Sequence, residues 1–579
     1  MLWLIFLCLV ALWLVVSRYQ NRRILQVASK IKCDIRAYPF VGHAYLFMGG
    51  GENRMRSFQK LGREAIKNGG LTNMWLGGQY YTVVVDPVDL EVILKSSLEK
   101  DDVMRFARHL IGNGTIFAPV SIWRPRRKVL APTFTPKNLN HFAKIFSRQS
   151  IVMIEQLKSV EGTGPVSVWK YLTSYTMDSV CETALGVNVN AQKTVNLPFL
   201  TAFDECCKLM AARMTQPWLQ ADALYRLLPY HASFEKCKNL ICSFIDEVIK
   251  SKRINMKEQN DDVKKNSAQD MKTFLELLIE ATGGDQGYSD LELQEETLVI
   301  VVAGTDTSAV GVSFAVSMLA RHPYVQELVY KELREVFGDS DRPVTSEDLP
   351  RLKYLDAVIR ETLRLYPPVP VIVRKIEKNV QLPSGVTLVE GCGVVVNIWG
   401  TQRNPRYWGR DAELFRPERF IDTPLTHPAA FMAFSYGPRN CLGIHFCIIV
   451  YVESAQYIFF FLSPLSDVTA PFTLFSFISI LSLSTHRYSI GIRYGSNLSV
   501  MFSDSIGRGL GKLISNNLSY CTQNYCMPGS TYKQIMASVT KTVCDPSTTI
   551  TICVGNSSKI KKEDITDCVS ELLKLINCN

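Results

Sequence analysis

The distribution of apolar and polar positions divides the chain into segments of different character. Residues 2–16 are uncharged and rich in Leu, Val and Trp, and Arg18, Arg22 and Arg23 follow this apolar run. Basic residues on the downstream side of such a run keep the following chain in the cytosol. We therefore predict a membrane signal-anchor in residues 1–17. A cleaved signal peptide is the alternative, and the anchor is favoured because no clear small-x-small cleavage site precedes the basic residues.

Helical periodicity dominates residues 58–364. A β-like run at residues 80–85 interrupts it, and residues 371–396 are rich in Val, Gly and Pro, which predicts a small sheet. The polar residues 257–272 have no apolar periodicity, so we expect an exposed loop there. The pattern as a whole predicts a mainly α fold with a smaller β region.

One predicted helix is long enough to cross the whole folded body. Residues 295–321 contain no Pro, and at 1.5 Å per residue they would span roughly 40 Å. Polar positions interrupt its apolar surface at residues 303–308, which read Ala-Gly-Thr-Asp-Thr-Ser. A threonine hydroxyl bonded back to a carbonyl and a glycine at a close helix contact would explain this interruption structurally. A functional site within the helix is the alternative explanation.

Composition indicates a globular chain with some membrane character. Of the 579 residues, 47% are hydrophobic and 20% are charged, which excludes a disordered protein. The formal net charge of +10 suits an acidic partner or an anionic membrane surface. Because the basic residues are scattered and show no zinc-finger, basic-zipper or RNA-binding aromatic pattern, we expect no nucleic-acid partner.

Residues 434–443 carry the clearest chemical signal in the chain. They read Phe-Ser-Tyr-Gly-Pro-Arg-Asn-Cys-Leu-Gly. A lone cysteine such as Cys441 is usually a small buried hydrophobe. A thiolate that faces an iron, however, needs backbone N–H groups around its sulfur, and Gly437 and Gly443 would permit the tight backbone that this requires.

The spacing Phe-x-x-Gly-x-Arg-x-Cys-x-Gly resembles the haem-binding loop of cytochromes P450 without a mismatch. The resemblance implies a mainly α haem-thiolate fold in which Cys441 ligates the haem iron. Phe434 would shield the sulfur from water, and Arg439 could bind a haem propionate through its guanidinium fork.

Residues 303–308 are similar to the family's oxygen-activating motif at every position. The likeness implies that Ala303 and Gly304 lie against the haem, with Gly304 leaving room for dioxygen. Thr307 would hold a distal water, and Asp306 would connect the site to solvent protons. Many fatty-acid hydroxylases of the family's animal microsomal group carry at the position of Ala303 a Glu that esterifies the haem. We therefore expect haem to be held non-covalently.

Weaker motifs follow in the family's order. Glu361 and Arg364 alone would be a solvated helix pair, but in the family this pair is buried and completed by an Arg from a Pro-Glu-Arg-Phe segment, here Arg419. The resemblance also assigns haem-propionate contacts to Trp123, Arg127 and Arg374. The other positive charges at residues 124–128 would form a solvated face, which in this family docks an acidic reductase.

The likeness covers about residues 30–447 and implies a monooxygenase that inserts one oxygen atom of O2 into a lipophilic small molecule, such as a xenobiotic, a fatty acid or another lipid. Electrons would come from NADPH through cytochrome P450 reductase, with cytochrome b5 as a second candidate partner. The enzyme would sit in the endoplasmic reticulum membrane with its catalytic domain facing the cytosol. Two rivals are a non-catalytic or defective haem-binding product and a haem-thiolate isomerase or dehydratase. Asp306 and Thr307 argue against the isomerase or dehydratase.

The C-terminal quarter has a different character. We expect a C-terminally incomplete monooxygenase domain at residues 18–447, an apolar segment at 448–490 and a Ser/Thr/Cys-rich tail at 491–579. A retained intron, frameshift or fused gene model is the favoured explanation, because a domain rarely tolerates the loss of its last helix and a sheet. Alternatively, residues 468–485 form a second membrane span that delivers a disulfide-bonded, glycosylated tail to the lumen.

Overall fold

The computed structural model describes residues 19, 22–160, 167–194, 197–262, 273–281 and 288–462, together with four strands between residues 489 and 553. The predicted anchor at residues 1–17 and the proposed second span at 468–485 lie outside these residues. The described chain is mainly helical with a smaller β region, as the sequence predicted.

The helices have the following bounds: α2 Arg22–Lys30, α3 Gly51–Lys67, α4 Pro87–Ser96, α5 Arg105–Ile111, α6 Val120–Leu130, α7 Pro136–Lys158, α8 Val168–Val180, α9 Pro198–Thr215, α10 Asp222–Tyr225, α11 Pro229–Asp262, α12 Phe274–Ala281, α13 Asp290–Arg321, α14 Pro323–Phe337, α15 Lys353–Leu365, α16 Ile398–Thr401, α17 Pro405–Trp408 and α18 Ile444–Leu462. The strands are β1 Leu71–Leu76, β2 Gln79–Val84, β3 Ile372–Lys375, β4 Val380–Gln381, β5 Thr387–Leu388, β6 Gly393–Val396, β7 Ser489–Ile492, β8 Leu498–Ser503, β9 Thr522–Cys526 and β10 Thr548–Cys553.

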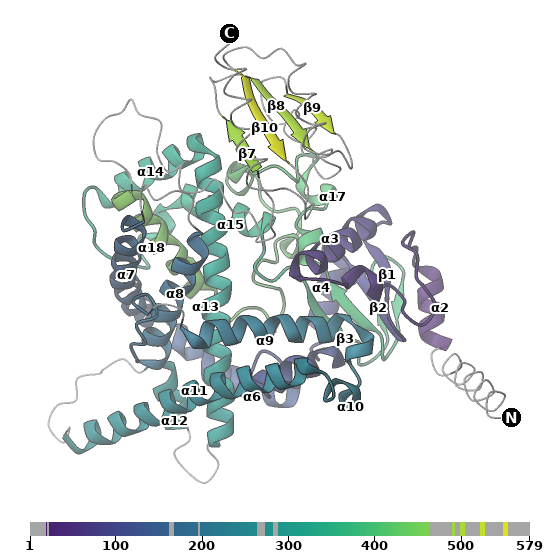
Figure 1. Cartoon of the computed structure of the whole chain (residues 1–579), viewed down its shortest axis with the longest axis horizontal. Coiled ribbons are helices and arrows are strands. Elements are labelled where there is room, and N and C mark those ends of the chain that lie inside the picture. Colours follow the sequence, from purple (N-terminus) through teal and green to yellow (C-terminus); the bar gives the residue numbers. More distant parts are fainter. Residues whose placement is uncertain are drawn as a thin grey trace, which may run out of the picture. The chain divides into compact units, whose positions relative to one another are not determined.

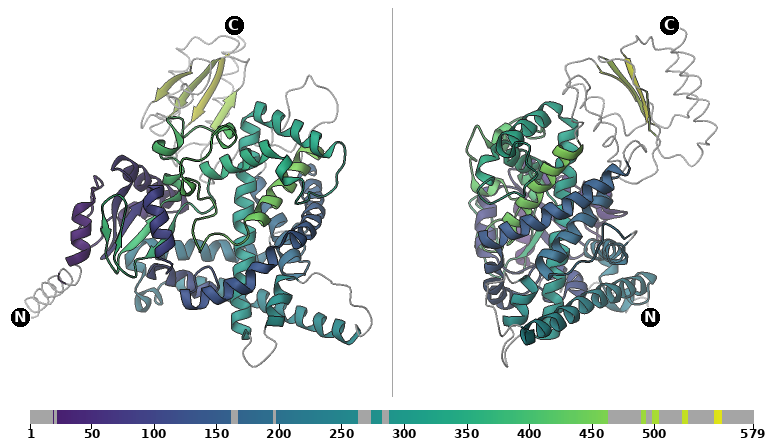
Figure 2. Two further views of the ribbon diagram at one scale, coloured as in Figure 1. Left: turned by 180° about the vertical axis from the view of Figure 1, so that it is seen from behind. Right: turned by 90° about the vertical axis from the view of Figure 1, so that its left-hand side faces the viewer.

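A four-stranded sheet of order β1-β2-β6-β3 lies at one side of the helical body, with α3 packed on it (Figures 1 and 2). β1 and β2 form an antiparallel hairpin whose turn contains Gly77 at φ +60°, a conformation that favours glycine. β2 was expected from its β-branched and aromatic residues, whereas β1 was not predicted. β6 pairs with β2 in parallel, which brings residues 393–396 beside residues 81–84.

The long helix α13 begins at Asp290, five residues before the start expected from the sequence. Ser289 explains the difference, because its hydroxyl accepts from the backbone N–H of Glu292 while the Glu292 carboxylate accepts from the N–H of Ser289. α13 is the described helix that is long and apolar enough to cross a membrane. Half of its most apolar window is buried inside the protein, which identifies a core helix.

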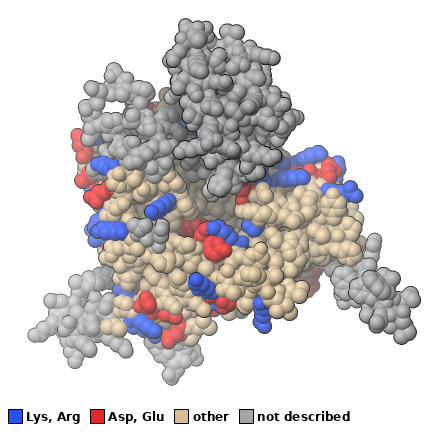
Figure 3. All heavy atoms as spheres, in the orientation of Figure 1, with Lys and Arg blue, Asp and Glu red and all other residues tan. Residues whose placement is uncertain are grey.

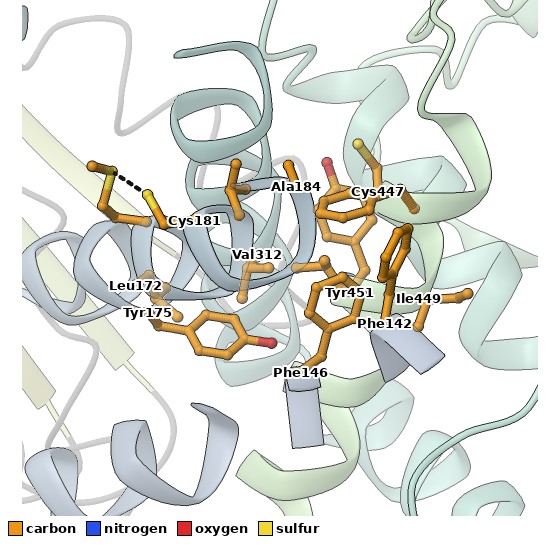
Figure 4. Packing of buried hydrophobic residues seen from close by; sticks show 14 of the residues in the cluster. Phe142, Phe146, Leu172, Tyr175, Cys181, Ala184, Val312, Cys447, Ile449 and Tyr451 are labelled. Atoms are coloured by element: carbon orange, nitrogen blue, oxygen red, sulfur yellow. Dashed lines mark hydrogen bonds between the residues drawn. The ribbon is translucent and has the colours of Figure 1, made fainter. Parts of the chain in front are cut away.

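Helices α7, α8, α13 and α18 enclose the main hydrophobic core (Figure 1). Figure 4 shows Phe142 and Phe146 of α7 beside Tyr451 of α18, with Val312 of α13 nearby. A Cβ added at Gly311 would lie 2.3 Å from the Tyr451 hydroxyl, so α13 and α18 approach closely there. The absence of a side chain at this position therefore allows the two helices to pack.

Two segment boundaries differ from the sequence prediction. The loop expected at residues 257–272 begins too early, because α11 continues to Asp262 through strong helix formers such as Lys, Glu and Gln. Residues 263–272 lie outside the described chain. α18 runs past residue 447 to Leu462, and its residues 449–459 are buried. The apolar ones belong to the same core as Phe446 and Cys447. A helix that is apolar all round is suited to such burial.

A second compact unit spans Leu481–Asn579. Its described strands form a sheet of order β7-β10-β8-β9. β10 runs parallel to β8 and antiparallel to β7. Most of the cysteine-rich tail on which the disulfide prediction rested lies outside the described residues.

Glu361, Arg364 and Arg419 form a buried network, as the resemblance implied. Two guanidinium nitrogens of Arg364 donate to Glu361 at 2.6 and 2.8 Å, and Nε of Arg419 donates to the same carboxylate at 3.0 Å. Arg364 also donates to the carbonyl of Gln402, whose side-chain oxygen accepts from the N–H of Met432. The network therefore joins α15 to the segment that leads into the Cys441 loop.

The charged residues on the face shown in Figure 3 are interspersed, with Lys and Arg beside Asp and Glu. Many pairs join residues on successive turns of one helix, such as Lys331 with Glu327 and Arg56 with Glu52. Exposed pairs of this kind contribute little to stability. The network around Glu361 is buried, and removing one partner of a buried ion pair costs much more stability than removing one partner of an exposed pair.

Replacing Glu361 by Ala would leave two buried guanidinium groups without their carboxylate. We expect the free energy of unfolding to fall by about 3–5 kcal/mol, because the uncompensated charges stay desolvated. Denaturant titration followed by circular dichroism measures this change. Glu327→Ala breaks an exposed pair and should cost about 0.5 kcal/mol or less. Equal losses in the two variants would contradict the buried network.

Glu453 of α18 is fully buried, and its Oε1 accepts from the backbone N–H of Val344 at 2.7 Å. Burial raises the pKa of this carboxyl to about 8. Between the unfolded-state pKa near 4.5 and pH 8 the folded state therefore binds the extra proton, so stability falls as pH rises across this window. The largest possible slope is about 1.4 kcal/mol per pH unit.

Glu453→Gln keeps the acceptor and removes the ionisation. We expect the melting temperature of this variant, relative to wild type, to rise steadily between pH 5 and pH 8 and to stay level above pH 8. Differential scanning fluorimetry over that pH series would test the expectation. Parallel pH profiles for the two proteins would show that Glu453 ionises as freely in the folded state as in the unfolded chain.

Candidate active site

A cavity of ≈ 320 Å³ lies between α13, the loop that precedes α18, and the end of α6. It brings together most of the residues singled out from the sequence: Trp123, Arg127, Ala303, Gly304, Thr307, Arg374, Phe434, Arg439, Cys441 and Gly443. Gly437, Asp306 and the network of Glu361, Arg364 and Arg419 lie outside its lining. Residues more than three hundred positions apart in the sequence thus share one site.

The Cys441 loop is held by backbone and side-chain contacts. The N–H of Cys441 donates to the carbonyl of Phe434 at 2.9 Å, and the N–H of Asn440 donates to that of Gly437 at 3.0 Å. Gly437 has φ +75°, and a Cβ there would lie 2.8 Å from the carbonyl oxygen of Leu94. The loop can take this path because glycine occupies that position.

Gly443 does not share this constraint. Its φ lies outside the left-handed region, and a Cβ there would meet the ring of Phe134 at an ordinary 3.6 Å. The expectation that both glycines allow a tight backbone therefore holds at Gly437 and is wrong at Gly443. Gly443 instead forms part of the cavity wall.

Arg127 fastens the loop to α6. Its two terminal nitrogens donate to the carbonyl and the side-chain oxygen of Asn440 at 2.8 and 2.7 Å. These contacts engage both terminal nitrogens of the side chain that was expected to reach a propionate. Arg127 also lines the cavity beside Cys441, whose side chain is accessible from the cavity.

A cluster of cations lines the same cavity: Lys100, Arg374 and Arg439. Nε of Arg374, and Nε and Nη1 of Arg439, are buried and have no hydrogen-bond partner. Among the ion pairs of the described residues, none involves any of the three cations. Burial lowers the pKa of both arginines to about 10 and that of Lys100 well below its usual value. Their positive charges therefore call for an anion.

Trp123 supports this cluster from α6. The guanidinium carbon of Arg439 lies 4.5 Å from the Trp123 ring centroid, and Nη2 of Arg439 donates to the carbonyl of Ala118 at 2.7 Å. The ring and the carbonyl fix the guanidinium while leaving its other nitrogens free. Trp123 therefore both lines the cavity and orients Arg439.

On α13, both structural explanations for the polar interruption hold. The Thr307 hydroxyl donates to the carbonyl of Ala303 at 2.7 Å, and a Cβ added at Gly304 would lie 2.8 Å from a methyl group of Val180. Ala303, Gly304 and Thr307 nevertheless face the cavity. The structural and functional explanations are therefore compatible.

Asp306 is exposed and lies apart from the cavity lining. Partial desolvation raises the pKa of its carboxyl, and the nearby Asp204 of α9 raises it further. The carboxyl is thus placed one residue from Thr307 and in reach of solvent. This is the position that a proton donor to the cavity would need.

A second thiol lies beside the loop cysteine and was not predicted. A hydrogen bond from Cys447 lowers the pKa of the Cys441 thiol, and the same contact raises that of Cys447. The Ser308 hydroxyl of α13 lies 3.8 Å from the Cys447 sulfur. Cys447 is buried in the first turn of α18, where Figure 4 shows it near Tyr451. Nothing in the local sequence distinguishes this cysteine from an ordinary core residue.

The donor set fits a haem. A cysteine sulfur can ligate iron from one side, and the unpartnered arginine nitrogens suit the two carboxylates at one porphyrin edge. Apolar side chains of α13 and β3, such as Val299, Ile300 and Ile372, form other walls. This combination defines the class of protein as haem-thiolate.

The comparisons with known proteins agree with this class. The family model for cytochrome P450 matches residues 35–449. The chain is 33% identical over 427 residues to cytochrome P450 4d2 of Drosophila melanogaster, covering 72% of this chain and 84% of that protein. It is 32% identical over 426 residues to human cytochrome P450 4V2, covering 72% and 80%. Cytochrome P450 4c21 of Blattella germanica is 30% identical over 387 residues, covering 65% and 76%.

The chain belongs to the cytochrome P450 family. It is therefore a haem-thiolate monooxygenase with iron protoporphyrin as cofactor, O2 as co-substrate and electrons supplied by a redox partner. Membership also implies a lipophilic substrate. The fold, enzyme class and cofactor predicted from the sequence are confirmed.

Two features of the site were not predicted from the sequence. Lys100 is a single lysine between two acidic residues, and no pattern marks it as part of the cation cluster. Arg126 was grouped with the solvated positive charges at residues 124–128, and this is wrong. Its side chain is buried and pairs with glutamates of α13. Burial of an arginine within a basic run depends on which helix packs against it.

Replacing Arg374 or Arg439 by Ala should speed the loss of haem. If these cations hold the propionates, each variant would lose a charge-assisted bond, so we expect roughly tenfold weaker haem retention or more. Transfer of haem to an excess of apomyoglobin, followed in the Soret region, measures the rate. The exposed Arg410 provides the control, and Arg410→Ala should behave as wild type. Unchanged retention in both cavity variants would contradict the assignment of these cations.

Proposed function

We propose that the protein inserts one atom of O2 into a neutral or acidic lipophile, such as a xenobiotic, a fatty acid or another lipid, with NADPH as the electron source through cytochrome P450 reductase. One observation carries the proposal. Cys441 and the unpaired cations Lys100, Arg374 and Arg439 line one cavity with the apolar surface of α13. An apolar chamber with one sulfur ligand and one cationic edge suits this chemistry.

Each side chain has a distinct task in the proposal. Cys441 ligates the iron, Phe434 excludes water from its sulfur, and Arg374 and Arg439 hold the propionates. Haem, when bound, supplies the oxygen and one-electron chemistry that amino-acid side chains lack. Ala303 presents no carboxylate, which supports non-covalent attachment. Substrate affinity then comes from apolar contacts with residues such as Ile116 and Val369, which line the cavity.

Proton delivery is proposed for Thr307 and Asp306. The Thr307 hydroxyl donates to the Ala303 carbonyl, so its oxygen lone pairs remain able to accept from a water in the cavity. Asp306 is exposed and would exchange protons with solvent. A raised carboxyl pKa favours such exchange near neutral pH.

The redox partner is proposed to approach the side of α6. Arg124 and Lys128 are exposed there, one helical turn apart, and Arg127 between them holds the Cys441 loop. Positive charge near the sulfur suits an acidic flavoprotein such as the reductase, and cytochrome b5 is a second candidate. The apolar run at residues 1–17 with its following arginines supports an anchor in the endoplasmic reticulum membrane.

Cys441→Ser in the full-length chain tests the proposal. We expect the reduced wild type to give a thiolate-type Soret band with carbon monoxide and the variant to lose it, because serine is a poor ligand for this iron. Cys33→Ser, at a partly buried cysteine in another part of the fold, should leave the spectrum unchanged. An identical spectrum in Cys441→Ser would overturn the ligand assignment.

Turnover separates the rival functions. Consumption of NADPH and O2 that depends on added reductase and lipophile supports a monooxygenase. A haem spectrum without any such consumption would identify a non-catalytic haem protein. Conversion of a lipophile without NADPH would identify an isomerase or dehydratase.

A further inference from the structure

Residues 112–118 lie between α5 and α6 and form part of the cavity wall. Thr115 and Ile116 line the cavity directly. The segment begins with Gly112 at φ +63°, and a Cβ there would lie 2.1 Å from Oε1 of Glu295. A Cβ on Gly114 would lie 2.3 Å from a methyl group of Val299. The backbone of this segment is therefore pressed against α13, with no room for side chains at either glycine.

Two glutamates of α13 hold the segment. Oε1 of Glu295 accepts from the N–H of Asn113 at 2.9 Å. Glu296 accepts twice from Thr115, through the backbone N–H at 2.9 Å and the hydroxyl at 2.6 Å. Glu296 is fully buried, so these bonds are shielded from water. Both oxygens of one buried carboxylate are thus aimed at a single residue of the cavity wall.

Arg126 completes the arrangement from α6. Its Nη1 donates at 2.8 Å both to Glu296 and to the carbonyl of Asn113, and its Nη2 donates to Glu292 at 2.8 Å. Only 6% of the Arg126 side chain is exposed. The guanidinium therefore compensates the Glu296 charge and contacts the segment itself. Charge-assisted bonds of this kind are stronger than neutral ones and fix geometry.

We propose that Glu296 is a positioning residue for the substrate, because through Thr115 and Arg126 it fixes the wall of residues 112–118 and so sets which molecules fit the cavity. The inference rests on the proposed function, since the wall matters for a ligand above the haem. Glu296 touches neither the cavity nor the reacting atoms. It acts only through the segment that it holds.

The proposal assigns different consequences to neighbouring side chains. Glu296→Gln keeps the shape but removes the charge and one acceptor. Thr115→Val removes the hydroxyl donor at nearly constant size, whereas Thr115→Ser retains it. Glu292→Gln is the matched control, because Glu292 pairs with the same guanidinium but has no hydrogen bond to residues 112–118 among the described contacts.

Hydrogen exchange of residues 112–118 gives the direct readout. We expect exchange to rise about tenfold in Glu296→Gln and in Thr115→Val, and to stay at the wild-type level in Thr115→Ser and Glu292→Gln. This measurement does not require haem. Equal exchange in all five proteins, wild type included, would overturn the proposal, as would a rise in Glu292→Gln equal to that in Glu296→Gln.

Ligand binding gives the second readout. Imidazole and 4-phenylimidazole share the iron-binding ring, and only the second carries a phenyl group that must also fit between the walls of the cavity. In Glu296→Gln we expect the Kd of 4-phenylimidazole to rise by about threefold to tenfold while that of imidazole stays within about twofold. Parallel changes for both ligands would contradict a role for the wall. A thiolate-type carbon-monoxide spectrum in every variant keeps this result separate from the proposed function.

Discussion

The position of the Cys441 loop depends on a buried carboxylate, that of Glu361. It binds Arg364 and Arg419, and Arg364 in turn donates to the carbonyl of Gln402. The Gln402 side chain returns two bonds to the end of α15 and accepts from Met432, just before the loop begins. A path of buried hydrogen bonds thus connects α15 to the segment that leads into the Cys441 loop. Because these groups are buried, none of them can turn to water without breaking another bond, and this restricts the position of the loop.

The cavity itself has the opposite electrostatic character. Lys100, Arg374 and Arg439 are crowded together, and the nitrogens of both arginines include donors without partners. Burying cations without counter-charges is costly, and here the cost shows as lowered pKa values. The two carboxylates at a porphyrin edge would relieve this repulsion. A bound haem would therefore be an electrostatic component of the folded domain as well as its reactive group.

Opposite this cationic edge, α13 combines two tasks. Its apolar face and small residues at Ala303 and Gly304 form a cavity wall, and its first turns carry the glutamates that pair with Arg126. Glu295 and Glu296 lie about two helical turns before those small residues, so one helix positions both this cavity wall and the segment at residues 112–118. A helix that is buried on several sides can do this because its contacts leave it no freedom to rotate.

The sequence by itself determined the family and the general fold, and it singled out Cys441 as the candidate ligand. The Cys441 loop and residues 303–308 are each one continuous stretch of sequence, so their motifs can be recognised without a structure. The helical periodicity likewise follows from local chemistry. Only tertiary structure decided which charges are buried. Arg126 and Arg124 are two residues apart in one basic run, yet the first faces α13 and the second faces solvent. Lys100, β1 and the contact of Cys447 with Cys441 likewise depend on segments that meet only in the folded chain, which no local pattern encodes.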